Sequence, residues 1–176
     1  MIRWKKLFFF CFGLFIASSF AMKWMEPDLV YAGNPISIFG LELFYPSEKI
    51  EQIFRGMDEK VAVILSYHLH FDYIFMAGCY PGIASLCMMA REKTARGIFK
   101  NILWGAALLQ TLAWAFDIAE NHYLLKWMDQ PQIGDSFTVY HFFVFSKWIL
   151  ALSGVVLAGS ILLFSGYRSL QKNANS

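Results

Sequence analysis

The sequence predicts an all-α membrane protein with four transmembrane helices, both termini in the cytoplasm, and one extracytoplasmic loop that carries a short amphipathic helix. Hydrophobic residues make up 57% of the 176 residues and charged residues only 16%, whereas soluble domains contain roughly 25% charged residues. The apolar residues also fall in long runs, and a run of about 18 or more can cross a hydrocarbon core of about 30 Å. We therefore expect residues 1–176 to form a single domain with lipid as its solvent.

Four apolar windows are long enough, or nearly long enough, to cross a bilayer. They cover about residues 7–22, 66–90, 98–125 and 140–167. The first window is short, but lysines flank it on both sides and their side chains can reach the membrane interfaces. Because basic residues precede this window and Ser19-Phe20-Ala21 closes it, a cleaved signal peptide is the alternative to a retained helix. We favour the retained helix.

The distribution of basic residues predicts the orientation of the chain. When four helices are threaded through the membrane, one side carries nine Lys and Arg residues and a single acid, Glu92. These basic residues are Arg3, Lys5, Lys6, Arg91, Lys93, Arg96, Lys100, Arg168 and Lys172. Since Lys and Arg concentrate in cytoplasmic loops, this side is expected to be cytoplasmic. The net charge of +2 therefore reflects topology and gives no reason to propose a nucleic acid partner.

The long connection between the first two spans, residues 23–60, is predicted to lie outside the cytoplasm and divides into two parts. Residues 34–45 contain Pro, Gly and β-branched residues and are predicted to be extended or to form turns. Ser47 is the predicted N-cap of a following helix, in which apolar residues recur at helical spacing between charged ones up to Met57. We expect this amphipathic helix to lie on the outer membrane surface or over the end of the bundle.

Three acids and one base fall inside the predicted spans, and they are Asp72, Asp117, Glu120 and Lys147. Each would cost about 2.5–3.5 kcal/mol at the centre of a helix in lipid, so the four should face one another or water. All lie at a similar distance from the outer ends of their spans. Helices that run alternately up and down therefore bring them to one level in the outer leaflet.

Helical phase supports this convergence. His68 and Asp72 are four residues apart, and Asp117 shares a helix face with Glu120 and Asn121. The predicted polar cluster comprises His68, Asp72, Asp117, Glu120, Asn121 and Lys147. Its three acids and one lysine carry a formal charge of −2, which a proton on a carboxyl or a histidine, a bound cation, or interfacial water has to offset.

The cluster has a structural and a functional interpretation. In the structural one, Lys147 pairs with Asp117 or Asp72 while Glu120 and Asn121 cap helix ends, which fixes helix register. In the functional one, it is a cation or metal site, a proton relay, or the polar end of a pocket for a lipid or small molecule. The chain contains no HExxH or paired ExxH motif, so we assign neither a metal nor a cofactor.

Motifs around these residues resemble an uncharacterised family of small bacterial membrane proteins. Its outer GI..FEL segment is matched by residues 39–43, its LDY.F motif by residues 70–75, with Phe71 in place of Leu, and its D..EN motif by residues 117–121. Lys147 matches a lysine that opens the last span of the family. The resemblance implies four spans in the bacterial cytoplasmic (inner) membrane and a shared polar network, with no assigned activity, and His68 is outside the pattern.

Three classes of function remain open. The first is a non-enzymatic membrane protein whose polar network binds a proton, a small cation or a lipid head group. The second is a structural or accessory subunit that packs against a membrane-protein partner or a second copy through small residues such as Gly154 and Ala158. The third is an intramembrane lipid-modifying enzyme with Asp117 or Glu120 as general base. No nucleophile, phosphate-binding loop or cofactor motif accompanies these acids, and the catalytic residues of such an enzyme are unknown, so we favour a non-enzymatic role.

Overall fold

The computed structural model describes residues 2–95 and 97–174, and most of these are helical. Four helices are long and apolar enough to cross a membrane, which confirms the predicted number. They are α1 (Ile2–Met25), α3 (Glu59–Lys93), α4 (Gly97–Asp129) and α5 (Ser136–Ala174). Each helix extends beyond the apolar window that predicted it, because charged residues with good helix propensity continue the helix past the apolar run. Of the basic residues used to predict orientation, Arg96 and the side chains of Arg168 and Lys172 lie outside the described part.

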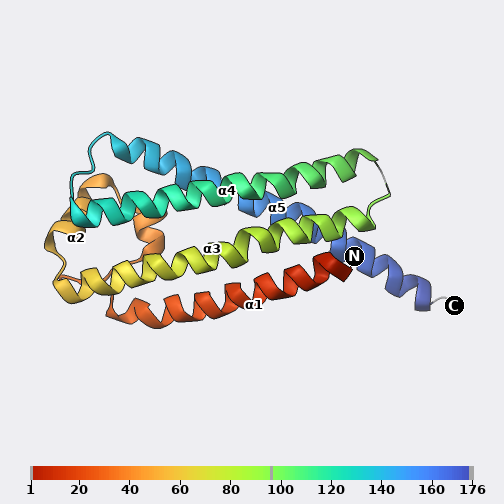
Figure 1. Cartoon of the computed structure of the whole chain (residues 1–176), viewed down its shortest axis with the longest axis horizontal. Coiled ribbons are helices and arrows are strands. Elements are labelled where there is room, and N and C mark those ends of the chain that lie inside the picture. The colour runs from red at the N-terminus through yellow and green to blue at the C-terminus, as the bar shows by residue number, and fades with distance from the viewer. Residues whose placement is uncertain (1, 96, 175–176) are drawn as a thin grey trace.

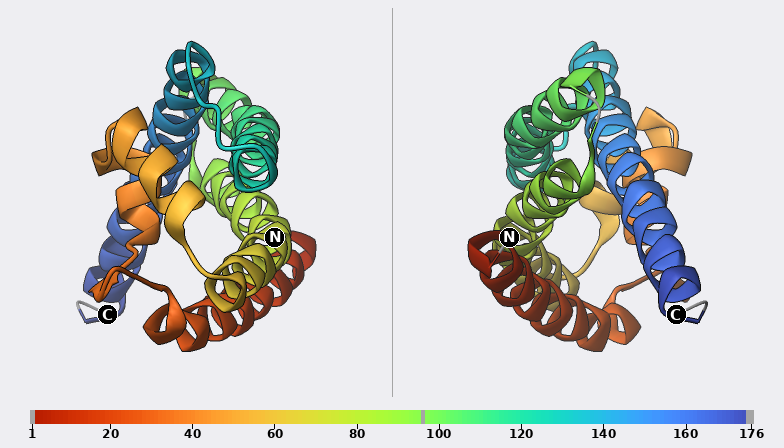
Figure 2. Two further views of the ribbon diagram at one scale, coloured as in Figure 1. Left: turned by 90° about the vertical axis from the view of Figure 1, so that its left-hand side faces the viewer. Right: turned by 90° about the vertical axis from the view of Figure 1, so that its right-hand side faces the viewer.

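Helices α1, α3 and α4 run side by side with α3 in the middle, and α5 crosses them obliquely (Figure 1). The connection from α1 to α3 and the turn from α4 to α5 lie at the same end, which we call the loop end. In the most apolar 18-residue window of α3, 44% of the residues are buried. The corresponding share is 11% in α1 and in α5. α3 packs against all three other long helices, whereas α1 packs extensively only against α3 among the described helices (Figure 2). The assembly is therefore a three-helix core with α1 attached along α3.

The contact between α1 and α3 depends on Gly78. A Cβ atom at this position would lie 2.6 Å from the backbone nitrogen of Phe15 and 2.8 Å from the carbonyl oxygen of Cys11, both on α1. Beside this contact, the rings of Phe15 and Phe75 lie with their centroids 4.9 Å apart. Small residues at a helix interface allow two backbones to approach in this way, and the approach gives dispersion contacts that lipid does not replace.

Residues 26–58 form a folded segment over the loop end, which we call the cap segment. A 3₁₀ turn, η1 (Glu26–Asp28), leads into a hairpin of β1 (Val30–Tyr31) and β2 (Asn34–Pro35). The turn residues Ala32 and Gly33 have φ values of 49° and 76°, as a tight two-residue hairpin turn requires. A π-helical turn, η2 (Gly40–Phe44), and the helix α2 (Ser47–Gly56) follow.

Two local predictions in the cap segment are wrong. Residues 38–44 are helical, not extended, because the Ser37 hydroxyl accepts a hydrogen bond from the Gly40 N–H and the turn buries Leu41 almost completely. Burial and this capping bond override the propensity of the β-branched residues. Ser47 is also not the N-cap of α2. Pro46 occupies that position with extended backbone, and its carbonyl accepts hydrogen bonds from the N–H groups of Lys49 and Ile50.

The apolar core is divided along the bundle into three sections. The section at the loop end packs Leu41 and Ile53 of the cap segment against Leu65, Trp127 and other residues of α3, α4 and α5. A middle section contains Met76, Tyr80 and Ala113, and the third, at the opposite end, contains Cys87, Ala90, Leu103 and Ala158. The four charged residues predicted to lie inside the spans, Asp72, Asp117, Glu120 and Lys147, fall in sequence between the first section and the middle one. They therefore form a polar layer with apolar packing on both sides.

Replacement of Gly78 by alanine should weaken the α1–α3 contact. The added methyl group would meet backbone atoms of α1, which cannot rotate away, so the free energy of unfolding should fall by about 1–3 kcal/mol. Gly105→Ala is the matched control, because a Cβ atom at Gly105 meets nothing within 4 Å. Thermal unfolding in detergent measures both variants, and equal stability of Gly78→Ala and Gly105→Ala would contradict the close contact.

Candidate functional site

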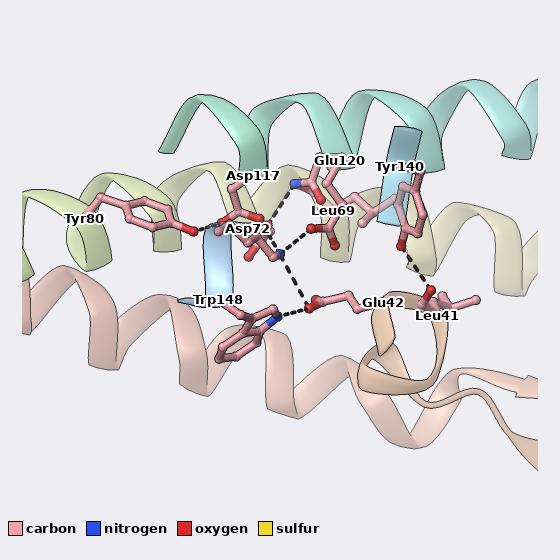
Figure 3. A network of polar contacts seen from close by, with 11 residues as sticks. Leu41, Glu42, Leu69, Asp72, Tyr80, Asp117, Glu120, Tyr140 and Trp148 are labelled. Carbon is pink, nitrogen blue, oxygen red and sulfur yellow. Dashed lines mark hydrogen bonds and ion pairs between the residues drawn. The ribbon is translucent and has the colours of Figure 1, made fainter. Parts of the chain in front are cut away.

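Lys147 of α5 lies among three carboxylates, of which two are buried and one is half-buried. Its Nζ atom is 2.5 Å from Asp117 Oδ1, 2.6 Å from Glu120 Oε2 and 3.5 Å from Glu42 Oε2. Asp117 and Glu120 project from α4, and Glu42 reaches the same point from η2 (Figure 3). The exposed fractions of the Lys147, Asp117 and Glu120 side chains are 7%, 3% and 1%, and that of Glu42 is 14%. The predicted buried ion pair is thus confirmed, and we call these four residues the Lys147 cluster.

Asp117 and Glu120 are held in different ways. Asp117 accepts hydrogen bonds on both oxygens, from Lys147 Nζ at 2.5 Å and from the Tyr80 hydroxyl of α3 at 2.7 Å. The ammonium group is close to Glu120 Oε2, but its direction does not meet hydrogen-bond geometry, and no other described residue donates to this oxygen. The Oε2 atom of Glu120 is therefore held by its ion pair with Lys147, whereas Asp117 accepts a hydrogen bond on each of its two oxygens.

Glu42 joins the cap segment to the cluster. Its Oε2 accepts a hydrogen bond from Trp148 Nε1 at 3.1 Å, in addition to the ion pair with Lys147. Burial raises the pKa of the Glu42 carboxyl above its ordinary value of 4.5; Lys147 and the Trp148 N–H oppose this rise, and Asp117 adds to it. A carboxyl in this setting takes up a proton more readily than one in water.

Helix α5 makes two more contacts with the same part of the cap segment. The buried Tyr140 hydroxyl donates a hydrogen bond to the carbonyl oxygen of Leu41 at 3.0 Å. About two turns further along the helix axis, the Trp148 ring lies 5.9 Å, centroid to centroid, from the ring of Phe39. Tyr140, Trp148 and Lys147 of α5 therefore all hold residues 39–42 in place.

Asp72 lies beside the cluster and is linked to it through α4. Asn121 Nδ2 donates to Asp72 Oδ2 at 2.9 Å and to the carbonyl oxygen of Leu69 at 3.2 Å. No described ion pair joins Asp72 to Lys147, and its side chain is half-buried. Because α4 continues to Asp129, Glu120 and Asn121 lie inside the helix, and the helix-capping roles considered for them are wrong.

His68 does not join the cluster. It is 2% exposed, and among the described residues no hydrogen bond or ion pair connects it to the four charged side chains. It precedes Asp72 by one helical turn, and that turn lies beside Leu65 and Leu69 in the apolar section of the loop end. His68 and Asp72 lie one turn apart on α3. The polar layer reaches Asp72 but is too thin to include His68 as well.

Sequence reasoning missed Glu42, Tyr80 and Trp148 as members of the network. Glu42 could have been found as the single acid in the otherwise mostly apolar run of residues 36–45. Tyr80 could have been found by phase, because it follows Asp72 by eight residues and therefore lies on the same face of α3. The indole N–H of Trp148 gave no such signal, since nothing in a sequence shows which loop residue will meet it.

The cluster is suited to binding protons. Among the described residues, no group of three or more His, Cys, Asp and Glu side chains is arranged to hold a metal ion. The position between the three carboxylates, where a metal would be bound, is filled by the lysine ammonium. With all four groups ionised the cluster has a formal charge of −2, and a proton can reduce this charge without needing further space.

Comparisons of this chain with protein-family profiles, with curated proteins and with solved structures find no match. The inference of function therefore rests on the geometry of the cluster.

Lys147→Met should destabilise the protein by about 3–5 kcal/mol, since it leaves buried carboxylates without their cation. A second change, Glu120→Gln, should restore part of this loss because it removes one of the uncompensated charges. Chemical unfolding in detergent gives both values.

Lys126→Met is the control for that experiment, because Lys126 is an exposed lysine of α4 and its loss should change stability by less than about 0.5 kcal/mol. If Lys147→Met and Lys126→Met were equally stable, the ammonium group would not hold the cluster together.

Proposed function

We propose that this chain is a non-enzymatic, multipass protein of the bacterial cytoplasmic membrane, in which the Lys147 cluster binds protons and so controls how firmly the cap segment is held against α5. One observation carries the proposal: a single ammonium group lies within 3.5 Å of three carboxylates, of which Asp117 and Glu120 are buried and Glu42 is half-buried. The excess of acid requires an additional positive charge, and a proton is the ligand that the packing admits.

The other ligands considered from the sequence fit the cluster less well. A metal ion would have to displace the Lys147 ammonium, which lies between the carboxylates. A phosphate head group would bring further negative charge to a site that already has too much. A neutral head group would need space beside Asp117 and Glu120, and both of these side chains are almost completely buried.

Glu42 provides the link between protonation and movement. When the cap segment is docked, burial raises the pKa of Glu42, and when it is detached, water restores the ordinary value of 4.5. Between these two values the docked state holds a proton that the detached state releases. The free energy that holds the cap segment in place is therefore highest at low pH and decreases as the pH rises through this window.

The proposed topology sets which compartment the cluster would sense. Basic residues gather at the end of the bundle away from the cap segment, and they include Arg3, Lys5, Arg91 and Lys100. This asymmetry supports cytoplasmic termini and an extracytoplasmic cap segment. The cluster, directly beneath the cap segment, would then respond to acidity outside the cytoplasm.

A role as structural or accessory subunit is the main alternative, with a membrane-protein partner or a second copy of the chain bound within the lipid. In that case the cluster keeps one protonation state at all accessible pH values and serves only to fix helix register. Titration of the cluster therefore distinguishes the two functions.

Infrared spectroscopy of the purified protein tests the proposal, because a protonated carboxyl and a carboxylate absorb at different frequencies. In the wild type the band of a protonated carboxyl should persist above pH 4.5, the ordinary pKa of a Glu carboxyl, and Glu42→Gln or Glu120→Gln should diminish this band. Hydrogen exchange of residues 37–45, corrected for the intrinsic rate, should accelerate in the wild type as the pH rises above 4.5, the ordinary pKa of a Glu carboxyl, and should lose this dependence in Glu42→Gln.

Glu51→Gln is the matched control, because Glu51 lies in the same cap segment but pairs with Arg55 on the surface. It should leave both the infrared band and the pH dependence unchanged. Proton binding would be rejected if infrared spectra showed every carboxyl ionised above about pH 5. It would also be rejected if elemental mass spectrometry found a near-stoichiometric metal in the wild type that is absent from Asp117→Asn.

Single cysteines introduced at Glu48 and Lys93 test the topology. Both positions are exposed and lie at opposite ends of the bundle. In a bacterial cell that expresses a variant without its native cysteines, a membrane-impermeant maleimide should label Glu48→Cys from outside. Lys93→Cys should react only after the cells are opened, and the reverse pattern would place the termini outside the cytoplasm.

A further inference from the structure

Two phenylalanines of the helical turn at residues 38–44 are exposed. The exposed fractions of Phe39 and Phe44 are 56% and 75%. They are five residues apart, which is one turn of a π-helix, so they lie on the same side of the turn. Gly40 and Leu41, which lie between them in the sequence, are buried. The turn therefore presents an aromatic surface to its surroundings.

The position of η2 along α5 indicates what these surroundings are. Glu42 contacts Lys147 and Trp148, and the Phe39 ring lies against the Trp148 ring (Figure 3). The apolar span Ser136–Tyr167 has 32 residues, whereas about 20 residues cross the hydrocarbon core. If the remainder projects equally at both ends, the core begins about six residues into the span, and Trp148 lies about 9 Å inside it along the helix axis.

The exposed residues of α5 agree with this depth. Phe142 and Phe145, which precede Trp148, are 60% and 50% exposed, and Ile149, which follows it, is 65% exposed. A helix that crosses a membrane exposes such apolar side chains to hydrocarbon, so the lipid boundary lies nearer the loop end than these residues. The turn is therefore level with the hydrocarbon of the leaflet at the loop end.

Backbone hydrogen bonds make the turn compatible with lipid. The N–H groups of Leu41 and Tyr45 donate to the carbonyl oxygens of Ser37 and Gly40 at 3.0 Å and 2.6 Å. Lipid offers no partners for backbone polar groups, so a segment at this depth has to pair them within the protein. The helical turn meets much of this requirement through its own backbone.

A lysine beside the aromatic surface matches the phosphate groups of the same leaflet. Lys49 is exposed, its Nζ atom lies 3.8 Å from the centroid of the Tyr45 ring, and it forms no ion pair with a described residue. Lys23, Arg55 and Lys60 at the same end are each paired with an acid. Aromatic groups in the hydrocarbon with a basic group at the level of the head groups are typical of segments that bind phospholipid.

We propose that the aromatic surface of η2 binds phospholipid of the leaflet at the loop end, with Phe39 and Phe44 among the acyl chains and the Lys49 ammonium beside a phosphate. The membrane then holds the cap segment in place together with α5. This binding does not depend on protonation of the Lys147 cluster, nor on which way the chain crosses the membrane.

A spin label on a single cysteine tests this contact in the full chain. A variant without its native cysteines carries Phe44→Cys and is reconstituted in vesicles of phosphatidylethanolamine and phosphatidylglycerol. The label should collide more often with oxygen, which concentrates in hydrocarbon, than with a nickel chelate, which stays in water. Ile149→Cys is the matched control for lipid, because it is exposed on α5 beside Trp148, and Glu48→Cys is the control for water.

The collision rates at Phe44→Cys distinguish the possible occupants of the aromatic surface. An excess of oxygen collisions like that of Ile149→Cys supports lipid. A ratio like that of Glu48→Cys would place the surface in water and overturn the proposal. Protection from both reagents would show that protein, such as a second copy of the chain, covers the surface, and would overturn it as well. Failure of the cluster to bind protons would change none of these results.

Two lysine variants test the phosphate contact. Lys49→Gln should lower the ratio of oxygen to nickel collisions at Phe44→Cys, because the turn loses its attachment to the head groups. Lys60→Gln is the matched control and should leave the ratio unchanged, since Lys60 pairs with Asp28. An equal ratio in the two variants would overturn the assignment of Lys49 to a phosphate.

Discussion

The fold depends on the contact of Lys147 with three carboxylates that come from different parts of the chain. Asp117 and Glu120 tie α5 to α4, and Glu42 ties it to the cap segment. The Tyr80 hydroxyl extends the same network to α3 through Asp117. In water such contacts contribute little, because each group gives up good hydration to make them. Inside an apolar bundle no hydration competes, so the lysine becomes the point at which four segments have to meet.

The apolar sections on either side of the polar layer make this meeting point specific. Leu65 and Trp127 lie on the side of the loop end, and Met76 and Ala113 lie on the other. Sliding one helix along another would move a charge among these apolar side chains, which is far more costly than any loss of packing. The layer thus defines helix register, while the contact at Gly78 holds α1 against α3 without any charged group.

The sequence predicts the parts of this structure in which one physical cost dominates. Runs of apolar residues give the number of helices, and the cost of charge in lipid leads directly to Asp117, Glu120 and Lys147. It predicts less where several weak preferences compete. Helical phase places His68 beside Asp72 but does not give the thickness of the polar layer. Glu42 was missed because a connecting segment has no periodicity, and its helical turn forms only when Leu41 is buried against α5 and its neighbours.

The position of Lys147 on the last helix has a consequence for how the chain is made. Glu42 of η2 and Asp117 and Glu120 of α4 are all synthesised before Lys147, which pairs with the three of them, so α4 inserted alone would carry Asp117 and Glu120 uncompensated into the membrane. Residues 130–135 form a short connection to α5, which allows α4 and α5 to insert as a hairpin with the ion pairs already in place. The bundle therefore closes only once α5 has been synthesised, and a chain without α5 differs from one that has it by its unpaired acids within the lipid.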